Sequence, residues 1–433
     1  MAYALRASIR IELQEYGEPV VLQAKYIDLD ILAEANKHWR NALGLSGDPV
    51  RVENIGNGLL KLRAEAVTGV VRVGRMDIEI APKFLGVAGS SWQTVLWRIL
   101  SVVEGGYIDD NLTAAHQLAS LPIPDLLAEI FLASYAKGAA RGLPRGYLSE
   151  QGAGNILRGN LDTSRLGEWI AKPWVLPYVA DLLTDDTALA RLLRWSAECL
   201  ATTVKVPGRS HALREISSVL AHVGKRPPHL LEAQRIYLGP QHQGLKAALV
   251  IGLLLLQGAG VHHASGEYSL SGFLWNSDTI YENYVYWLCQ RAASRRGKRV
   301  NKSEIKFGQI VRGSGGMLKT TPDVVFYENS VPVAVTDAKY KHIYSQPKAQ
   351  DTYQVLTAGH ILGCRRVSLT YPVAIDREPT VWSVPSALGG HDIELTVLPI
   401  NLMRLTLSGG QEALIDRIGA WLEGEYIRHS IDS

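Results

Sequence analysis

TPDVVFYENSVPVAVTDAKYKH, residues 321–342, is the stretch that decides the fold of its region and concentrates the chemistry of this sequence. Two apolar runs, residues 324–327 and 331–335, flank a short polar segment, residues 328–330, which is the pattern of a β-hairpin. Pro322 precedes the first run, at a strand start where its missing N–H costs nothing. The stretch predicts two antiparallel strands with charged residues at their far end.

The predicted register of this hairpin sets two carboxylates opposite each other. In an antiparallel pair the numbers of facing residues have a constant sum, and a turn near Ser330 makes that sum about 660. Asp323 then faces Asp337, with Cβ atoms roughly 5 Å apart. Successive side chains of a strand point to opposite faces, so Lys339 shares the face of Asp337. Two carboxylates and one ammonium therefore converge at the end of the hairpin.

Like charges that face each other across a sheet are destabilising, so something must compensate for the two aspartates. Lys339 offsets part of the repulsion, and a divalent cation offsets more. Mg²⁺ prefers hard oxygen ligands and is held by one or two carboxylates with room for water and phosphate oxygens. The alternative is a surface hairpin that ends in ordinary solvated charges. The apolar strands, the Pro-Asp opening and the spacing occur together, and this combination favours the Mg²⁺ site.

Composition limits the classes of protein to consider. The chain has 433 residues, enough for two or three domains, and is 47% hydrophobic and 20% charged, as in a globular protein with a substantial core. A net charge of +3 permits a nucleic-acid partner without requiring one. Cys199, Cys289 and Cys364 lie far apart, which argues for a reducing cytosol and against a disulfide framework or a zinc site.

The sequence shows no targeting segment. Its N-terminus alternates like a strand and has no apolar signal core. The longest apolar run, residues 247–256, is too short to cross a bilayer and predicts a buried helix. We therefore expect a cytoplasmic protein.

Three regions follow one another along the chain, and together they predict an α+β multidomain protein. Residues 1–88 are β-rich, with alternating apolar residues and Gly or Asn turn signals. Residues 89–265 repeat apolar side chains mainly at helical spacing. Residues 266–433 alternate helix and strand, with helices expected over 279–291 and 349–362, the second closed by Gly363.

Two further polar residues lie on the predicted helices of the third region. Glu282 is at the edge of an apolar helical stripe and can reach a neighbouring site, although a solvated glutamate explains it as well. Gln354 follows the hairpin on the next helix, where it can hold a water or a phosphate. A surface amide is an equally good interpretation.

A basic segment, RAASRRGKRVNK at residues 291–302, gives a candidate DNA-binding surface. Together with Lys341 it can track a phosphate backbone. The helix dipole explains basic residues at a helix C-terminus equally well. The candidate DNA contacts are Arg295, Arg296, Lys298, Arg299 and Lys341.

Some chemistries have no motif in this sequence. GSGGMLKTT, from residue 313, lacks the glycine before lysine that a P-loop requires, so we expect no NTP binding of that type. No GxSxG motif supports serine catalysis, and the histidines show no ligand spacing.

The region from Tyr281 onward resembles the PD-(D/E)xK nuclease module of McrC, the endonuclease subunit of the modification-dependent McrBC restriction systems. Weaker resemblance extends upstream to about residue 70. The segments that carry it are IYENYVYWL (280–288), TPDVVF (321–326), VTDAKYKH (335–342), DTYQVLTAGHIL (351–362), SLTYP (368–372) and LTVLPINL (395–402).

The resemblance implies a restriction-endonuclease-like α/β domain over residues 266–433. By position, Asp323 and Asp337 match the metal-binding carboxylates and Lys339 the catalytic lysine. Glu282 matches the acidic residue of the preceding helix and a candidate metal ligand, and Gln354 the helix glutamine. The carbonyl of Ala338 is a plausible third Mg²⁺ ligand, and Lys339 would orient or deprotonate the attacking water or stabilise developing charge.

The resemblance also implies partners. McrC acts with McrB, an AAA+ GTPase ring that reads modified DNA, and stimulates its hydrolysis. Double-stranded, modified DNA is the expected substrate, residues 1–88 are the candidate docking domain for the ring, and self-association through the nuclease domain is a further expectation. Two alternatives stay open: a stand-alone PD-(D/E)xK repair or junction nuclease, and a non-catalytic regulator of an AAA+ ring.

Overall fold

A computed structural model gives the fold of the chain. It describes residues 9–73, 76–85, 92–105, 121–140, 142–257, 263–265, 268–302, 304–308, 318–343, 346–385 and 392–426. These residues form two compact units. The first unit combines Met1–Ile123 with Gly258–Ser433, and the second is Pro124–Gln257. Each unit is described by itself below.

The first unit begins with a five-stranded sheet in the order β1-β6-β5-β11-β10. Its strands are β1 (Ile9–Gln14), β5 (Val67–Val73), β6 (Met76–Ala81), β10 (His263–Ser265) and β11 (Tyr268–Asn276). A smaller sheet has the order β2-β4-β3. Its strands are β2 (Val20–Gln23), β3 (Val50–Gly56) and β4 (Leu59–Ala64), which lie between β1 and β5 in the sequence. The helix α1 (Leu29–Leu43) and both sheets share one hydrophobic core that includes Trp39, Leu62 and Ile78. This core organises the N-terminal part of the unit.

The antiparallel pairing of β5 with β11 joins residues about 200 positions apart. Gly69 makes this pairing possible. Its φ is +139°, and a Cβ at this position would lie 2.1 Å from the carbonyl oxygen of Phe273. Only a residue without a side chain allows the two backbones to approach so closely. The N-terminal segment and the chain after residue 268 therefore fold as one body.

The second large sheet of the same unit has the order β12-β15-β16-β17-β19-β18. Its strands are β12 (Arg299–Asn301), β15 (Val324–Glu328), β16 (Val331–Ala338), β17 (Arg366–Val373), β18 (Thr380–Val384) and β19 (Ile393–Asn401). Strands β16, β17 and β19 run parallel, and the other neighbours are antiparallel. A two-stranded ribbon, β13 (Ile305–Gly308) with β14 (Leu318–Thr320), precedes the hairpin.

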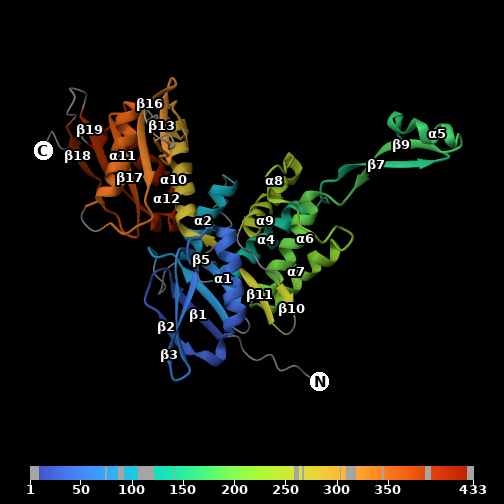
Figure 1. Cartoon of the computed structure of the whole chain (residues 1–433), viewed down its shortest axis with the longest axis horizontal. Helices are drawn as coiled ribbons and strands as arrows, with labels where there is room; N and C mark the ends of the chain where they lie inside the picture. The colour runs from blue at the N-terminus through green and yellow to red at the C-terminus, as the bar shows by residue number, and fades with distance from the viewer. Residues whose placement is uncertain are drawn as a thin grey trace, which may run out of the picture. The chain divides into compact units, whose positions relative to one another are not determined.

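Helices cover both faces of this six-stranded sheet (Figure 1). They are α10 (Ser277–Ser294), α11 (Ala349–Leu362) and α12 (Gly410–Glu423), with the 3₁₀ segment η4 (Leu402–Thr406). The helix α2 (Trp92–Gly105) packs against α10 and η4. Phe326 of β15 contacts Trp421 of α12, whereas Val335 of β16 packs in the cluster that contains Val355 of α11. Because side chains alternate along a strand, α11 and α12 lie on opposite faces.

The predicted hairpin over residues 321–342 is confirmed. Val324 pairs with Thr336 and Phe326 with Ala334, so the numbers of facing residues sum to 660 from Val324 to Phe326. An irregularity after Phe326 changes the register nearer the turn. Asn329 and Ser330 make the turn, with φ of 47° and 69°. Two consecutive positive φ values are those of a type I′ turn, which matches the twist of paired strands.

The second unit is mainly helical and carries a projecting β-ribbon (Figure 1). The helices are α4 (Ile123–Ala139), α6 (Ala188–Thr203), α7 (Pro207–Val219), the short α8 (Leu230–Ala233) and α9 (Lys246–Gln257). The ribbon consists of β7 (Gly146–Gly154), β8 (Asn160–Leu161), α5 (Leu166–Ala171) and β9 (Leu176–Thr184). We call residues 146–184 the arm. The run 247–256 forms the buried helix α9, as predicted.

The prediction of a mixed α+β protein is confirmed, and the helices expected over 279–291 and 349–362 are α10 and α11. Gly363 ends α11 in the left-handed conformation, with φ of 66°. Two elements differ from the sequence expectation. The helix α1 interrupts the β-rich region, because its buried face is completed by strands distant in sequence. The arm interrupts the helical region, because β7 pairs with β9 across the intervening residues.

The structure also groups the predicted regions differently. Residues 1–88 and 266–433 were expected as separate domains, whereas β11 adds the later segment to the sheet of the earlier one. Removing residues 1–88 would therefore take β5 and β6 away from β11. Among the helices of the described residues, none is long and apolar enough to cross a membrane.

Candidate active site

The candidate site lies at the end of the hairpin opposite its turn, where Asp323 enters β15 and Asp337 leaves β16. Oδ2 of Asp323 accepts a hydrogen bond from the backbone N–H of Ala338 at 2.8 Å. This bond crosses the hairpin and fixes the Asp323 side chain next to Asp337, as the register predicted. Both aspartates are buried, with 9% and 2% of their surface exposed.

Asp337 lies in a position that disfavours its charge. Burial and the nearby carboxylate of Asp323 together raise its pKa to about 6, against the opposing effect of Lys339. Oδ2 of Asp337 is buried, contacts the ammonium of Lys339 and receives no hydrogen bond of good geometry. The site therefore contains a carboxylate oxygen whose negative charge is incompletely compensated by the protein.

Lys339 is held at both its backbone and its side chain. Its N–H donates to the carbonyl of Thr370 on the adjacent β17 at 2.9 Å, and its Nζ donates to Oε1 of Gln354 at 3.2 Å. Burial acts to lower its pKa, but the carboxylate of Asp337 outweighs this and raises the pKa above its usual value. Lys339 is therefore a positive charge, and Gln354 of α11 positions it.

Glu282 reaches the site from α10 through a lysine that the sequence did not single out as a site residue. Nζ of Lys302 lies 3.3 Å from Oδ1 of Asp323 and 3.7 Å from Oε2 of Glu282. Burial raises the pKa of Glu282, and the charge of Asp323 adds to this effect. The pairing of β12 with β15 sets Asn301 opposite Val325 and so brings Lys302 beside Asp323, and no pattern in the sequence signalled this pairing.

A second group of residues outside the hairpin supports the site from the N-terminal sheet. Oε2 of Glu15, at the end of β1, accepts a hydrogen bond from the hydroxyl of Tyr340 at 2.8 Å. Nζ of Lys83 lies over the ring of Tyr340, 4.0 Å from its centroid. Burial raises the pKa of Glu15 to about 7, although Lys83 opposes the shift. Nothing in the local sequence pattern connects residue 15 with residue 340.

The candidate DNA-binding residues are engaged in contacts within the unit. Arg295 forms ion pairs with Glu412 and Asp416 of α12, and Arg296 with Glu423 at 3.5 Å. These contacts join α10 to α12.

Lys298 pairs with Glu328 at 2.8 Å, and Arg299 donates to Ser330 Oγ at 3.2 Å. Both contacts are at the turn of the hairpin, roughly 17 Å from Asp323 along a five-residue strand. Lys341 pairs with Asp351 at 2.9 Å and is the one candidate among the five that is near Lys339 in the chain. The structure thus gives these side chains intramolecular partners, and their contact with DNA stays a prediction.

The candidate ligand atoms are of the chemical type that Mg²⁺ prefers. Asp323, Asp337 and the carbonyl of Ala338 offer hard oxygens, and the incompletely compensated Oδ2 of Asp337 is the atom that a cation would satisfy. Within the described residues, however, no group of three or more His, Cys, Asp and Glu side chains is arranged to hold a metal. Glu282 is separated from Asp323 by Lys302, so its role as a direct ligand remains a prediction.

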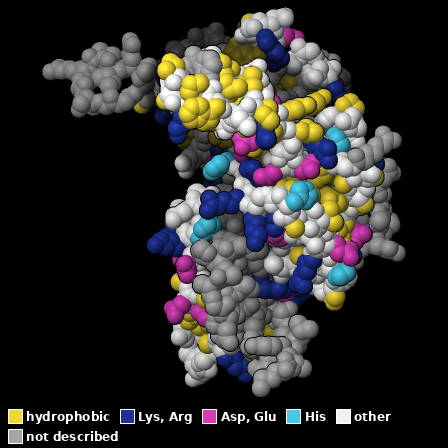
Figure 2. All heavy atoms as spheres, turned by 90° about the vertical axis from the view of Figure 1, so that its right-hand side faces the viewer, with side chains coloured by type: hydrophobic (Ala, Val, Ile, Leu, Met, Phe, Trp, Pro, Cys, Tyr) yellow, Lys and Arg dark blue, Asp and Glu magenta, His cyan; other side chains and the backbone are white. Residues whose placement is uncertain are grey.

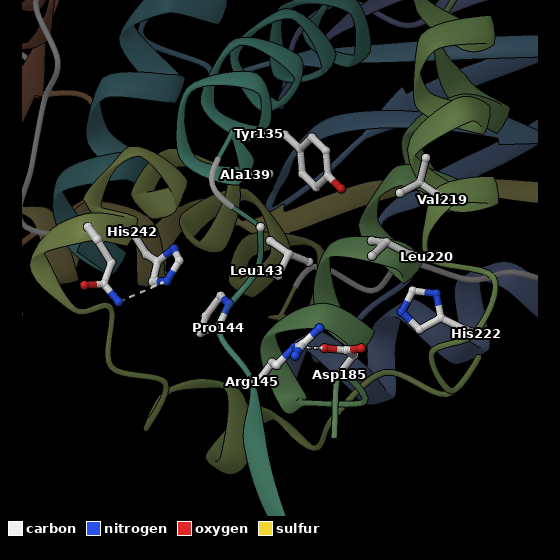
Figure 3. Close-up of a pocket in the computed structure, with 12 residues that line it drawn as sticks. Tyr135, Ala139, Leu143, Pro144, Arg145, Asp185, Val219, Leu220, His222 and His242 are labelled. Atoms are coloured by element: carbon white, nitrogen blue, oxygen red, sulfur yellow. Dashed lines mark hydrogen bonds and ion pairs between the residues drawn. The ribbon is translucent and has the colours of Figure 1, made fainter. Parts of the chain in front are cut away.

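A different cavity lies in the second unit (Figure 3). It has a volume of about 860 Å³ and lies at the base of the arm, where Arg145 precedes β7 and Asp185 follows β9. These two residues form an ion pair, with Arg145 Nε 2.7 Å from Asp185 Oδ1. Asp185 is the sole carboxylate among the described lining residues, so this cavity lacks the paired acids that phosphodiester cleavage with Mg²⁺ uses.

Comparisons with known proteins agree with the sequence resemblance. A family model described as "McrBC 5-methylcytosine restriction system component" matches residues 62–372. The fold is similar to a chain in a refined half-complex from a tetradecameric assembly of Thermococcus gammatolerans McrB AAA+ hexamers with bound McrC. The TM-score is 0.61 at 16% identity, covering 94% of this chain and 99% of that chain.

A chain in the cryo-EM structure of the Thermococcus gammatolerans McrBC complex matches with a TM-score of 0.45 and 17% identity, over 65% of this chain and 88% of that chain. No curated protein matches the sequence.

Proposed function

The chain belongs to the McrBC 5-methylcytosine restriction system component family, and from this premise we propose that it is the Mg²⁺-dependent DNA endonuclease subunit of such a system. Its C-terminal sheet and helices would be a PD-(D/E)xK nuclease domain. The observation that carries the proposal is the pair of facing, buried carboxylates, Asp323 and Asp337, with the ammonium of Lys339 beside them. Buried carboxylates with perturbed pKa values are concentrated at functional sites, which supports a catalytic role for this pair.

Asp323, Asp337 and the Ala338 carbonyl would hold the Mg²⁺. When bound, the cation would supply an activated water and neutralise charge on the phosphate. The protein itself contributes by holding the two carboxylates in position. The bond from Ala338 N–H to Asp323 orients one carboxylate, and the strand β16 orients the other.

Lys339 carries its charge beside the place where the phosphate would react. Because its pKa is raised, it acts by stabilising negative charge that develops on the phosphate and by orienting water, rather than by removing a proton. Gln354 holds Nζ of Lys339 in place through its Oε1. Loss of Gln354 would therefore misplace the lysine without removing it.

We further propose that the subunit works with an AAA+ ring of the McrB kind. The similar chain comes from an assembly of McrB AAA+ hexamers with bound McrC, which supports such a partner. The arm offers an apolar docking surface. Figure 2 looks onto this side of the second unit and shows hydrophobic side chains gathered there. The exposed ones on the arm are Tyr147, Leu148, Ile156, Leu157, Ile170, Trp174, Leu182 and Leu183.

An exposed apolar surface of this kind marks an interaction site. Residues 1–88 are the docking candidate from the sequence. The arm is the stronger candidate, because eight of the side chains described within its 39 residues are hydrophobic and exposed, on both faces of the ribbon.

The test is plasmid cleavage by the full chain, alone and with an AAA+ partner, nucleotide and Mg²⁺. We expect cleavage of methylated DNA with the partner, none in EDTA, and none with Asp337→Asn or Lys339→Ala. Lys319→Ala is the matched control, because Lys319 is an exposed lysine paired with Glu304.

Cleavage by Asp337→Asn at the wild-type rate would disprove the site. Efficient cleavage by the lone chain would favour a stand-alone nuclease. Stimulation of the ring's NTP hydrolysis without any cleavage would favour a regulator.

A further inference from the structure

The ammonium of Lys302 occupies the place where the proposed site meets Glu282. Lys302 follows β12 directly, and its Nζ lies between Oδ1 of Asp323 and Oε2 of Glu282, at 3.3 Å and 3.7 Å. The other oxygen of Asp323, Oδ2, already accepts the N–H of Ala338. Both oxygens of Asp323 are therefore engaged, and a metal ion that binds Oδ1 either displaces Lys302 or shares the oxygen with a second positive charge, which repels it.

The two lysines of the site differ in how firmly they are held. Lys339 has 14% of its side chain exposed and is bound by both Asp337 and Gln354. Lys302 has half of its side chain exposed, and the two carboxylates are its ion-pair partners in the structure. A lysine is a strongly hydrated charge on a flexible stem, so an exposed one moves into water at little cost. Of the two ammonium groups, Lys302 is the displaceable one.

Lys302 compensates negative charge at the site. Asp323 and Asp337 lie next to each other at the end of the hairpin, and Glu282 shares the ammonium of Lys302 with Asp323. Lys339 contacts Asp337, so among the residues that the structure describes Lys302 is the cation that compensates Asp323 and Glu282. A divalent cation offers the same compensation with more charge and shorter contacts.

We propose that Lys302 is an internal counter-cation that holds the metal position in the metal-free protein and is displaced when a divalent ion binds. This inference rests on the metal site of the proposed function. Lys302 competes with the metal, so the apparent affinity for the metal is lower than the carboxylates alone would give. The residue thus tunes the metal concentration at which the site becomes occupied.

The test measures metal binding directly, with no DNA and no partner. Mn²⁺ is the probe, titrated into the full-length protein while the electron paramagnetic resonance signal of free Mn²⁺ is recorded. The variants are Lys302→Met, which keeps the length and removes the charge, and Lys302→Arg, which keeps a charge. Lys319→Met removes an exposed lysine paired with Glu304 elsewhere in the same unit and controls for net charge.

We expect Lys302→Met to bind Mn²⁺ about tenfold more tightly than wild type, because removing a like charge next to the ion favours binding. Lys302→Arg should stay close to wild type, and Lys319→Met should change affinity by less than about twofold, because exposed and distant charges are screened. Thermal melts check that each variant is folded.

Equal or weaker binding by Lys302→Met would overturn the inference, as would an equal gain in Lys319→Met. Asp323→Asn separates the two proposals. If wild type and Lys302→Met bind no Mn²⁺, or if Asp323→Asn binds as wild type does, the metal site itself is wrong. If Asp323→Asn abolishes binding but Lys302→Met does not tighten it, only the role of Lys302 fails.

Discussion

The hydroxyl of Tyr340 donates a buried hydrogen bond to Glu15, 325 residues earlier in the chain, at 2.8 Å. Tyr340 follows Lys339 directly, so this bond ties the strand end that carries the proposed catalytic lysine to the first strand of the N-terminal sheet. Phe84 packs against the Tyr340 ring as well, with ring centroids 5.0 Å apart. The N-terminal sheet is therefore a support of the site.

Replacing Glu15 by Gln should change how stability depends on pH. The folded protein raises the pKa of Glu15 from 4.5 to about 7, so the native state holds a proton that the unfolded state releases. The contribution of Glu15 to wild-type stability then falls as pH rises from about 4.5 to 7, by about 3 kcal/mol at most.

Denaturant unfolding of wild type and Glu15→Gln at pH 4.5 and pH 8 measures this difference. We expect the advantage of the variant to grow with pH, whereas Glu12→Gln, at an exposed position of the same strand, should show no such trend. A difference that is the same at both pH values would contradict the prediction.

Asp337→Asn should stabilise the protein while abolishing cleavage. The buried carboxylate has its pKa raised from 3.8 to about 6 and faces Asp323, so its ionised form costs roughly 1–3 kcal/mol at pH 8 in the absence of metal. A neutral amide of the same shape removes that cost. Thermal melts in EDTA should show a higher melting temperature for the variant at pH 8 and a smaller gain near pH 4. A lower melting temperature at pH 8 would refute this.

Arg295→Ala should leave DNA affinity unchanged. Its guanidinium pairs with Glu412 and Asp416, which neutralise it, and an exposed ion pair contributes less than about 1 kcal/mol to stability. The measurement is the affinity for duplex DNA over a range of salt concentrations. If the variant binds more weakly with a shallower salt dependence, Arg295 contacts phosphate and the prediction from the sequence holds instead.

Polar substitutions on the arm should weaken the complex with the AAA+ ring without unfolding the protein. Tyr147→Ser and Trp174→Ser remove apolar surface from side chains that are 77% and 70% exposed, so we expect at least about tenfold weaker binding and an unchanged melting temperature. Ring binding and stimulated NTP hydrolysis are the readouts.

Val21→Ser is the matched control for the arm, since Val21 is 50% exposed on β2 in the N-terminal part of the chain. If Val21→Ser weakens the complex and the arm variants do not, the docking surface lies within residues 1–88, as the sequence suggested.

The sequence by itself determined the hairpin and the central pair of acids. Register in a short hairpin depends on the turn and on the alternation of a few neighbouring side chains, so a turn near Ser330 placed Asp323 opposite Asp337. In the structure the turn residues Asn329 and Ser330 and the irregularity that follows Phe326 together give this register. The approximate ends of α10 and α11 could also be predicted from the sequence, because they depend on local signals. Their apolar spacing and the glycine after α11 act within a few residues.

Only the tertiary structure decided which residues surround that pair. Lys302 and Glu15 reach the site through strand pairing between distant segments, and no local pattern encodes such contacts. Gln354 was a candidate from the sequence, but its bond to Lys339 became visible only when α11 was placed. The same holds for Arg295 and Arg296, whose charge was visible in the sequence but whose acidic partners on α12 were not. A charge is a property of a residue, whereas its role depends on the charges that the fold brings within a few ångströms of it.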